Sequence, residues 1–250
     1  MKTICLILLI FATILCPSVP SVQADDAIVT MVADPWSPYY DKNLPGYGFA
    51  AEIISAAYAT KSYRVTFSFL PWVRAMKSVE KGKYDAIATA WFNEERDKKY
   101  LFSKPYTESH ILFFHKKETP LAWNRLEDLK NKTIGVVRGY SYSPEFNAAD
   151  YIKKNAANNT SQNIKKLLKN RLDVVIMDKF VGLYYFNNEY KEYADKVIYN
   201  TRPVSVNKLH CLFSRNIPGI RKKIEAFNSG LEEIIKDGTY DAILAKHHLR

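Results

Sequence analysis

The sequence is poor in cysteine and glycine and lacks the short motifs that mark common enzyme classes. Only 3 cysteines and 9 glycines occur among the 250 residues. No Gly-x-Ser-x-Gly elbow, glycine-rich phosphate loop, His-Glu-x-x-His helix or Cys-x-x-Cys pair is present. These absences argue against hydrolase, nucleotide-binding and zinc-enzyme chemistry, and we expect neither a cofactor nor a metal.

Long apolar runs are also absent, with one exception at the beginning of the chain. Lys2 precedes an unbroken apolar run over residues 4–15, and small residues lead up to Ala24. The pattern predicts a signal peptide over residues 1–24, cleaved after Ala24, and therefore a soluble periplasmic protein. A lipoprotein attached at Cys16 is the alternative, although Leu15 is large for that site. Cys211 would then be the only cysteine of the mature protein, which excludes an internal disulfide.

An excess of positive charge is present, but a nucleic-acid motif is not. Lysine and arginine number 36 against 26 acidic residues, giving a formal net charge of +10. The lysines are spread along the chain, mostly with acidic residues nearby, and no zinc-finger spacing accompanies them. We interpret the charge as a solvated surface and expect no nucleic-acid partner.

Strand and helix patterns alternate through the chain. Such alternation predicts an α/β protein whose ligand site lies at the carboxyl ends of the strands. Ser143 and Pro144 form a strong helix start, with serine as the N-cap and proline at the first helical position. The expected strands are residues 27–33, 63–70, 86–90, 133–137, 172–177 and 208–214, and the expected helices are 49–58, 73–81, 161–169, 179–186 and 218–236.

The segment from Tyr84 to Tyr106 is the most informative part of the sequence. A short apolar strand is followed by Asn-Glu-Glu-Arg at residues 93–96 and then by Phe-Ser-Lys-Pro-Tyr at residues 102–106. This order resembles the extracellular solute-binding proteins of family 3, in which Thr-x-Glu-Arg precedes Phe-Ser-x-Pro-Tyr at the same interval. Asn93 replaces the usual threonine. Pro-Trp-Val-Arg-Ala at residues 71–75 resembles a Pro-Trp-x-Arg-Ala subgroup of the family.

The resemblance implies a two-lobe fold of the type II periplasmic binding proteins, with a mixed sheet flanked by helices in each lobe. Residues 25–107 and 209–250 would form a discontinuous lobe 1, and residues 108–208 would form lobe 2. Two hinge segments, near residues 107–110 and 205–208, would join the lobes. The implied function is capture of a small polar ligand, such as an amino acid or a derivative, by a monomer that delivers it to the permease of an ABC transporter.

The resemblance also implies a binding site between the lobes. Arg96 would hold the ligand carboxylate, since a guanidinium can donate to both of its oxygens. Asp178 would hold the ammonium, although an aspartate before a helix can equally be an N-cap. Backbone N–H groups of the loop at residues 138–142 would bind an oxygen of the ligand. The complete set of expected ligand contacts is Trp36, Trp72, Thr89, Ala90, Trp91, Arg96, Arg138, Gly139, Tyr140, Ser141 and Asp178.

Two alternatives remain open at the level of sequence. A sensor module that reports a ligand to a membrane signalling partner would have the same lobes and the same site. A dehydratase on this fold would need a buried general acid, for which Glu94 and Glu95 beside Arg96 are the candidates.

Overall fold

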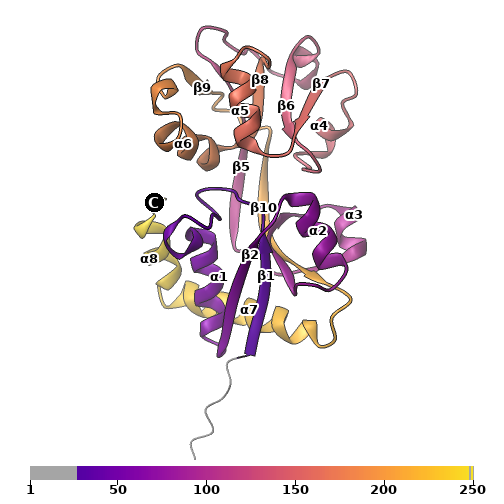
Figure 1. Cartoon of the computed structure of the whole chain (residues 1–250), viewed down its shortest axis with the longest axis vertical. Helices are drawn as coiled ribbons and strands as arrows, with labels where there is room; N and C mark the ends of the chain where they lie inside the picture. Colours follow the sequence, from indigo (N-terminus) through magenta and orange to yellow (C-terminus); the bar gives the residue numbers. More distant parts are fainter. Residues whose placement is uncertain (1–26, 248, 250) are drawn as a thin grey trace, which may run out of the picture.

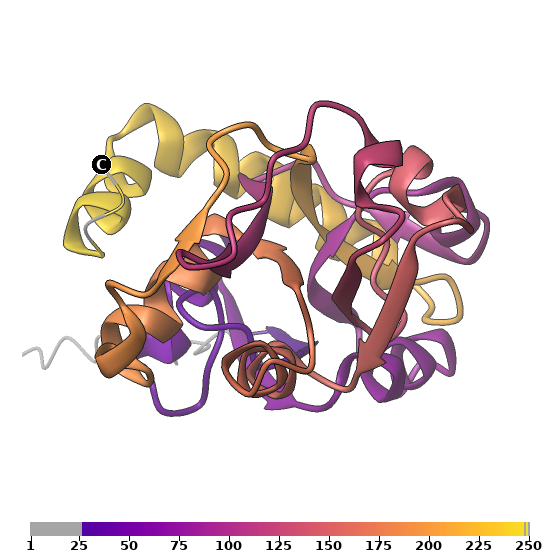
Figure 2. The same cartoon turned by 90° about the horizontal axis from the view of Figure 1, so that it is seen from above.

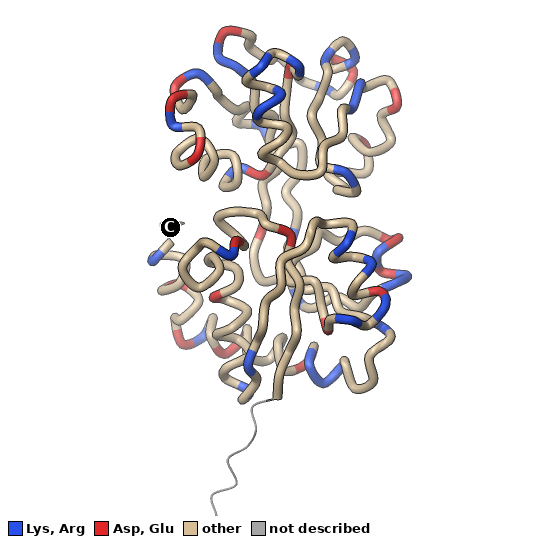
Figure 3. The backbone as a smooth tube through the Cα atoms, in the orientation of Figure 1, with Lys and Arg blue, Asp and Glu red and all other residues tan. Residues whose placement is uncertain are grey.

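The computed structural model describes residues 27–247 and 249, which form two lobes stacked one above the other (Figure 1). The expected signal peptide and its cleavage after Ala24 lie outside the described residues. No helix within residues 27–247 combines the length and the apolar character that a membrane crossing requires. Lysines and arginines are scattered over both lobes (Figure 3). This distribution agrees with the interpretation of the charge as a solvated surface.

Lobe 1, the lower lobe in Figure 1, is built on three parallel strands. The central strand β1 pairs with β2 on one side and with β3 on the other. The lobe's strands and helices are β1 (Ala27–Ala33), α1 (Phe49–Ala59), β2 (Tyr63–Phe69), α2 (Trp72–Glu80), β3 (Ala86–Trp91), α3 (Glu94–Lys99), β4 (Tyr100–Phe102), α7 (Ile220–Lys236) and α8 (Thr239–Lys246). A short 3-10 helix, η1 (Pro45–Tyr47), precedes α1.

Lobe 2 repeats the same pattern with the middle of the chain. Strand β6 pairs in parallel with β7 and β8, and the helices flank this sheet (Figure 1). The elements are η2 (Leu126–Leu129), β6 (Thr133–Val137), α4 (Pro144–Ala148), β7 (Lys153–Ala157), α5 (Thr160–Leu168), β8 (Val174–Asp178), α6 (Lys179–Asn188), η3 (Lys191–Tyr193) and β9 (Val197–Tyr199). Helix α4 begins as predicted, since the Ser143 hydroxyl accepts a hydrogen bond from the backbone N–H of Phe146.

Two long antiparallel strands connect the lobes, β5 (Thr107–Lys116) and β10 (Ser205–Ser214). They pair with each other over residues 107–111 and 205–209. Beyond that stretch β10 continues beside β3 in lobe 1, whereas β5 continues beside β8 in lobe 2. The strands of both lobes therefore belong to one continuous hydrogen-bonded sheet. The exact lobe boundaries at residues 107/108 and 208/209 stay a prediction.

The C-terminal helices return to lobe 1 and lie along one side of the molecule (Figure 2). Helix α7 packs against α1 at close range. A Cβ atom at Gly230 would lie 1.9 Å from the backbone oxygen of Ala57, so no larger residue fits at this crossing. The close contact fixes the C-terminal segment onto the first lobe.

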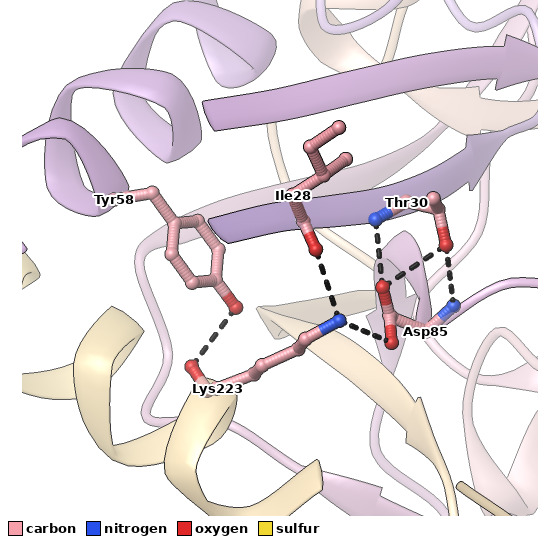
Figure 4. A network of polar contacts seen from close by, with 5 residues as sticks. All are labelled: Ile28, Thr30, Tyr58, Asp85 and Lys223. Atoms are coloured by element: carbon pink, nitrogen blue, oxygen red, sulfur yellow. Dashed lines mark hydrogen bonds and ion pairs between the residues drawn. The ribbon is translucent and has the colours of Figure 1, made fainter. Parts of the chain in front are cut away.

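A partly buried ion pair reinforces the same part of lobe 1 (Figure 4). The Asp85 carboxylate accepts hydrogen bonds from the backbone N–H and the hydroxyl of Thr30, and it pairs with Lys223 at 2.7 Å. The Lys223 ammonium also donates to the backbone oxygen of Ile28, while its own backbone oxygen accepts from Tyr58. These bonds join β1, α1 and α7 at the end of the lobe that faces away from lobe 2 (Figure 1).

Several elements differ from the sequence-based expectations. Residues 94–99 form helix α3 although they have no apolar periodicity, because the Asn93 side chain caps the first turn. Residues 107–116 form one long buried strand, whereas only a hinge segment was predicted there. The edge strand β7 was not predicted, since Lys-Lys-Asn-Ala-Ala has little strand character.

Candidate functional site

An aromatic cavity opens where the carboxyl ends of β1 and β3 in lobe 1 face lobe 2. Its volume is about 30 Å³ in this closed arrangement, room for one or two water molecules. A small-molecule ligand would therefore occupy it only after the lobes or the lining side chains move apart. Its lining residues are Asp34, Trp36, Trp72, Thr89, Ala90, Trp91, Arg96, Tyr140 and Leu209. Seven of the expected contacts are therefore brought together here: Trp36, Trp72, Thr89, Ala90, Trp91, Arg96 and Tyr140.

Arg96 projects into this cavity from α3 and is 6% exposed. Its guanidinium donates to the backbone oxygen of Trp91 at 2.7 Å and to that of Gly139 at 3.4 Å. The Arg96 Cζ also lies 4.9 Å from the ring centre of Trp72, a cation–π contact. Burial lowers the pKa of Arg96 to about 10, so the side chain stays charged at neutral pH. No ion pair to Arg96 occurs among the described side chains.

The second charged group of the cavity, Asp34, was missed by the sequence analysis. It directly follows β1 and is 8% exposed. Its carboxylate accepts a hydrogen bond of 2.9 Å from the hydroxyl of Tyr140, which belongs to lobe 2. Burial raises the pKa of Asp34 to about 7, against the opposing effects of the Tyr140 bond and of the backbone N–H of Trp72. An acidic residue immediately after a parallel strand was the available signal, because such strand ends form the ligand edge of the sheet.

Asp178 lies at the end of β8 and is 1% exposed. One carboxylate oxygen accepts from the backbone N–H of Val181 at 3.1 Å, so Asp178 is the N-cap of α6. The other accepts from the hydroxyls of Ser109 at 2.8 Å and Tyr39 at 3.1 Å, and Tyr39 comes from lobe 1. Burial raises the pKa of Asp178 to about 6, while its hydrogen bonds oppose the rise.

Asp178 and Arg96 line different cavities. Asp178 borders a smaller, more enclosed cavity beside the first. Trp36, Trp91 and Tyr140 border both cavities and form the wall between them. Trp36 stacks on Tyr39 with a centroid distance of 4.2 Å and meets Trp91 edge-on at 6.0 Å. A ligand in contact with both charged groups must therefore pass through or displace this aromatic wall.

The loop at residues 138–142 differs from the expectation that its backbone N–H groups face the ligand. The N–H of Arg138 donates to Ala157, and that of Tyr140 donates to Val137. Gly139 has a φ of +79°, which suits glycine, and it presents its carbonyl oxygen to lobe 1. That oxygen accepts from the Trp72 indole at 3.0 Å as well as from Arg96. The loop thus presents an acceptor to lobe 1, and binding of a ligand oxygen by its other N–H groups stays a prediction.

Three of the expected contacts, Arg138, Gly139 and Ser141, lie outside both cavities. Arg138 is exposed. Ser141 accepts from the Asn147 amide at 2.8 Å and, with Gly139, borders a groove on the outer side of the cleft.

Two further features concern the aromatic cavity. Thr89 accepts a hydrogen bond of 2.6 Å from Tyr106, and the buried indole N–H of Trp91 has no hydrogen-bond partner among the described residues.

A family model described as bacterial extracellular solute-binding proteins, family 3, matches residues 28–250. The chain belongs to this family. The assignment confirms the resemblance inferred from the segment around Arg96, and with it the two-lobe fold and the class of function, solute binding outside the cytoplasm. Whether the chain belongs to the Pro-Trp-x-Arg-Ala subgroup stays a prediction.

Individual members of family 3 are similar to this chain at modest identity. The arginine-binding periplasmic protein of Mannheimia haemolytica is 32% identical over 131 residues, about half (52%) of either chain. The L-cystine-binding protein TcyJ of Escherichia coli (strain K12) is 25% identical over 222 residues, 82% of this chain and 75% of TcyJ. A solved structure, an ancestral arginine-binding protein bound to arginine, has a TM-score of 0.76 at 27% identity and covers 88% of this chain and 97% of that one.

The candidates for dehydratase chemistry are not buried. Glu94 and Glu95 are both exposed on the first turn of α3. The dehydratase alternative requires a buried general acid, and neither residue meets that requirement. Membership of a binding-protein family is consistent with ligand capture.

Proposed function

We propose that this family 3 protein is the periplasmic receptor for an amino acid or a close derivative, which it delivers to the permease of an ABC transporter. The observation that carries the proposal is the state of Arg96. Among residues 27–247, this buried, charged guanidinium has two backbone oxygens and an aromatic ring as its partners. A buried cation without a counterion is costly, and a ligand carboxylate would relieve this cost with two charge-assisted hydrogen bonds.

The cationic end of the ligand has two carboxylates available. Asp178 is the partner that we expect for the ligand ammonium, across the wall formed by Trp36, Trp91 and Tyr140. Asp34 lies in the same cavity as Arg96 and offers a second acidic group. Each charge-assisted bond contributes about 1.5 to 3 kcal/mol, so a few of them together with ring burial would give micromolar affinity.

Capture itself makes and breaks no covalent bond. Arg96 and the indole rings belong to lobe 1, whereas Asp178 and Tyr140 belong to lobe 2, so a ligand held by both sets joins the lobes. The indole N–H of Trp91 is a donor that a ligand oxygen would satisfy. We propose that the closed, liganded monomer is the form that the permease recognises.

Ligand binding tests this function directly. Purified protein is unfolded, dialysed to remove any bound solute and refolded, and its Tm is then measured with each of the common amino acids at millimolar concentration. A ligand at 100 times its Kd stabilises the folded state by about 2.7 kcal/mol, so a receptor shows a clear rise in Tm for one chemical group of amino acids. A flat response to the whole panel would contradict the proposal.

The panel also separates the receptor from the enzyme. After incubation with the solute that raises Tm, chromatography should recover it unchanged, whereas a dehydratase would convert it. A sensor gives the same binding result as a receptor, and uptake of the labelled solute by cells with and without the gene distinguishes those two.

A further inference from the structure

Tyr140 belongs to lobe 2 and lines the aromatic cavity together with residues of lobe 1. Its ring lies edge-on to Trp72 at 5.7 Å and to Trp91 at 5.5 Å, measured between ring centres. Its hydroxyl donates to Asp34 at 2.9 Å. The adjoining Gly139 carbonyl accepts from Trp72 and Arg96. Two consecutive residues of one loop thus contact both charged groups of the opposite lobe.

The partners that lobe 2 offers to the two charged groups are themselves uncharged. Arg96 donates to a carbonyl oxygen rather than to a carboxylate, and Asp34 accepts from a hydroxyl rather than from a cation. Each of these bonds has one charged partner, and a solute with a carboxylate and a cationic group would add the attraction between opposite charges at both positions. A zwitterionic solute therefore offers stronger partners than Gly139 and Tyr140 do.

The burial of Asp34 points the same way. Its carboxyl group has a pKa near 7, raised mainly by burial, so the Tyr140 bond does not compensate for the loss of water around this acid. A cation at this position would favour the ionised carboxylate more than the phenol does. The phenol is thus a partner that a cationic group of the ligand can replace.

We propose that Tyr140 is the specificity-determining gate of the cavity: its phenol links the two lobes, and it must leave Asp34 before a solute with a cationic arm can occupy the space between Trp72 and Trp91. The proposal rests on the proposed function for the class of solute. While Tyr140 stays in place, the cavity beside Arg96 has a volume of only about 30 Å³. Displacement of the phenol admits a longer, positively charged solute, such as a basic amino acid.

The first experiment measures the link between the lobes without any added solute. Spin labels are attached at Lys77→Cys on α2 and Glu145→Cys on α4, two exposed positions on helices of opposite lobes. Both helices lie on the same side of the molecule (Figure 1). The native Cys211 is 0% exposed and does not compete for the label. Pulsed electron paramagnetic resonance then gives the distribution of distances between the two spin labels in the refolded parent protein, in Tyr140→Phe and in Tyr140→Ala.

We expect one short distance in the parent, a mixture in Tyr140→Phe, which loses only the bond to Asp34, and mainly longer distances in Tyr140→Ala. Tyr151→Ala is the matched control, because Tyr151 is a tyrosine of the same lobe that is 46% exposed. It should leave the distribution unchanged. An unchanged distribution in a folded Tyr140→Ala protein would overturn the proposal, whether or not the parent binds any amino acid.

The second experiment measures selection by size. Kd values for alanine and arginine are determined by calorimetry at pH 8 for the parent, Tyr140→Phe and Tyr140→Ala. We expect the ratio of the arginine Kd to the alanine Kd to fall at least tenfold in Tyr140→Ala and less in Tyr140→Phe. If both Kd values change in parallel, Tyr140 is only a part of the wall and the gate is wrong. If the parent binds neither solute, the proposed function needs another ligand, while the distance measurement still decides the link.

Discussion

Two tyrosine–aspartate pairs cross the cleft in opposite directions. Tyr140 of lobe 2 donates to Asp34 of lobe 1, whereas Tyr39 of lobe 1 donates to Asp178 of lobe 2. Both carboxyl groups are buried and have raised pKa values, about 7 for Asp34 and about 6 for Asp178. The two aspartates nevertheless have different roles.

The difference lies in the other partners of each carboxylate. Asp178 also caps α6 through Val181 and accepts from Ser109, so its own lobe and the connecting strand hold it firmly. Asp34 has the Tyr140 hydroxyl and the backbone N–H of Trp72, and it shares its cavity with Arg96. Asp178 therefore has a structural role whatever binds, whereas Asp34 is better placed to exchange its partner.

The largest expected effect separates the two acids by the pH dependence of stability. An acid whose pKa is raised on folding binds more protons in the folded than in the unfolded state, so the free energy of unfolding falls as pH rises through that interval. For Asp34 the interval runs from about 4 to 7, and the rise in pKa from 3.8 to about 7 corresponds to roughly 4 kcal/mol at pH 8. Asp34→Asn should thus match the parent at pH 4 and exceed it at pH 8.

For Asp178→Asn the interval should end near pH 6 and the gain should be smaller, because the pKa rises only from 3.8 to about 6. The groups that face Asp178 are Tyr39, Ser109 and two backbone N–H groups of α6, and those that face Asp34 are Tyr140 and the N–H of Trp72, with Arg96 in the same cavity. Urea unfolding at pH 4, 6 and 8 measures both variants. If the free energies of unfolding of the two variants depend on pH in the same way, Asp34 and Asp178 do not differ in the way described above.

The next effect concerns ligand affinity in the cavity of Arg96. Arg96→Ala should weaken binding of the solute found in the thermal panel at least a hundredfold, since two charge-assisted bonds are lost. Arg221→Ala, at an exposed position on α7, is the control and should bind like the parent. Calorimetric titration gives both constants, and parent-like affinity in Arg96→Ala would move the site elsewhere.

A smaller effect tests whether the ligand also reaches the cavity of Asp178. Asp178→Asn keeps the shape of the side chain and removes its charge, so binding of an ammonium should weaken about tenfold at pH 8. Asp34→Asn provides the comparison at the same pH. If only Asp34→Asn weakens binding, the cationic end of the solute remains in the first cavity and the zwitterion trap between Arg96 and Asp178 is wrong.

The smallest expected effect concerns the wall between the two cavities. Trp91→Phe removes a buried N–H that has no partner among the described residues, and it keeps an aromatic ring in the wall. The Tm should change little, because no hydrogen bond is lost, while affinity should fall a few fold if the indole donates to a ligand oxygen. Unchanged affinity would show that Trp91 only packs.

Sequence reasoning found the parts of this molecule that local patterns determine. The strand over residues 27–33 and the capped start of α4 at Ser143 follow from alternation and from capping chemistry, and both have the predicted bounds. Arg96 was identified by its interval to Phe102. These signals lie within a few residues of each other and need no knowledge of the tertiary structure.

The cross-cleft contacts could not be predicted in the same way. Tyr140 and Asp34 are 106 residues apart, and Tyr39 and Asp178 are 139 apart, so only the folded arrangement of the lobes brings them together. The orientation of Gly139 depends on its positive φ, which turns its carbonyl oxygen toward lobe 1. Glu94–Lys99 becomes helical through a cap rather than through an apolar face.

The paired strands β5 and β10 have a mechanical consequence. Residues 107–111 pair with residues 205–209, and both strands cross from one lobe to the other as extended backbone. The lobes therefore cannot move straight apart without disrupting these strands. Twisting of this two-stranded ribbon can keep the hydrogen bonds between β5 and β10. A small twist of the ribbon then moves the far ends of the two lobes over a large distance. Surfaces remote from the hinge would therefore move the most when the lobes close.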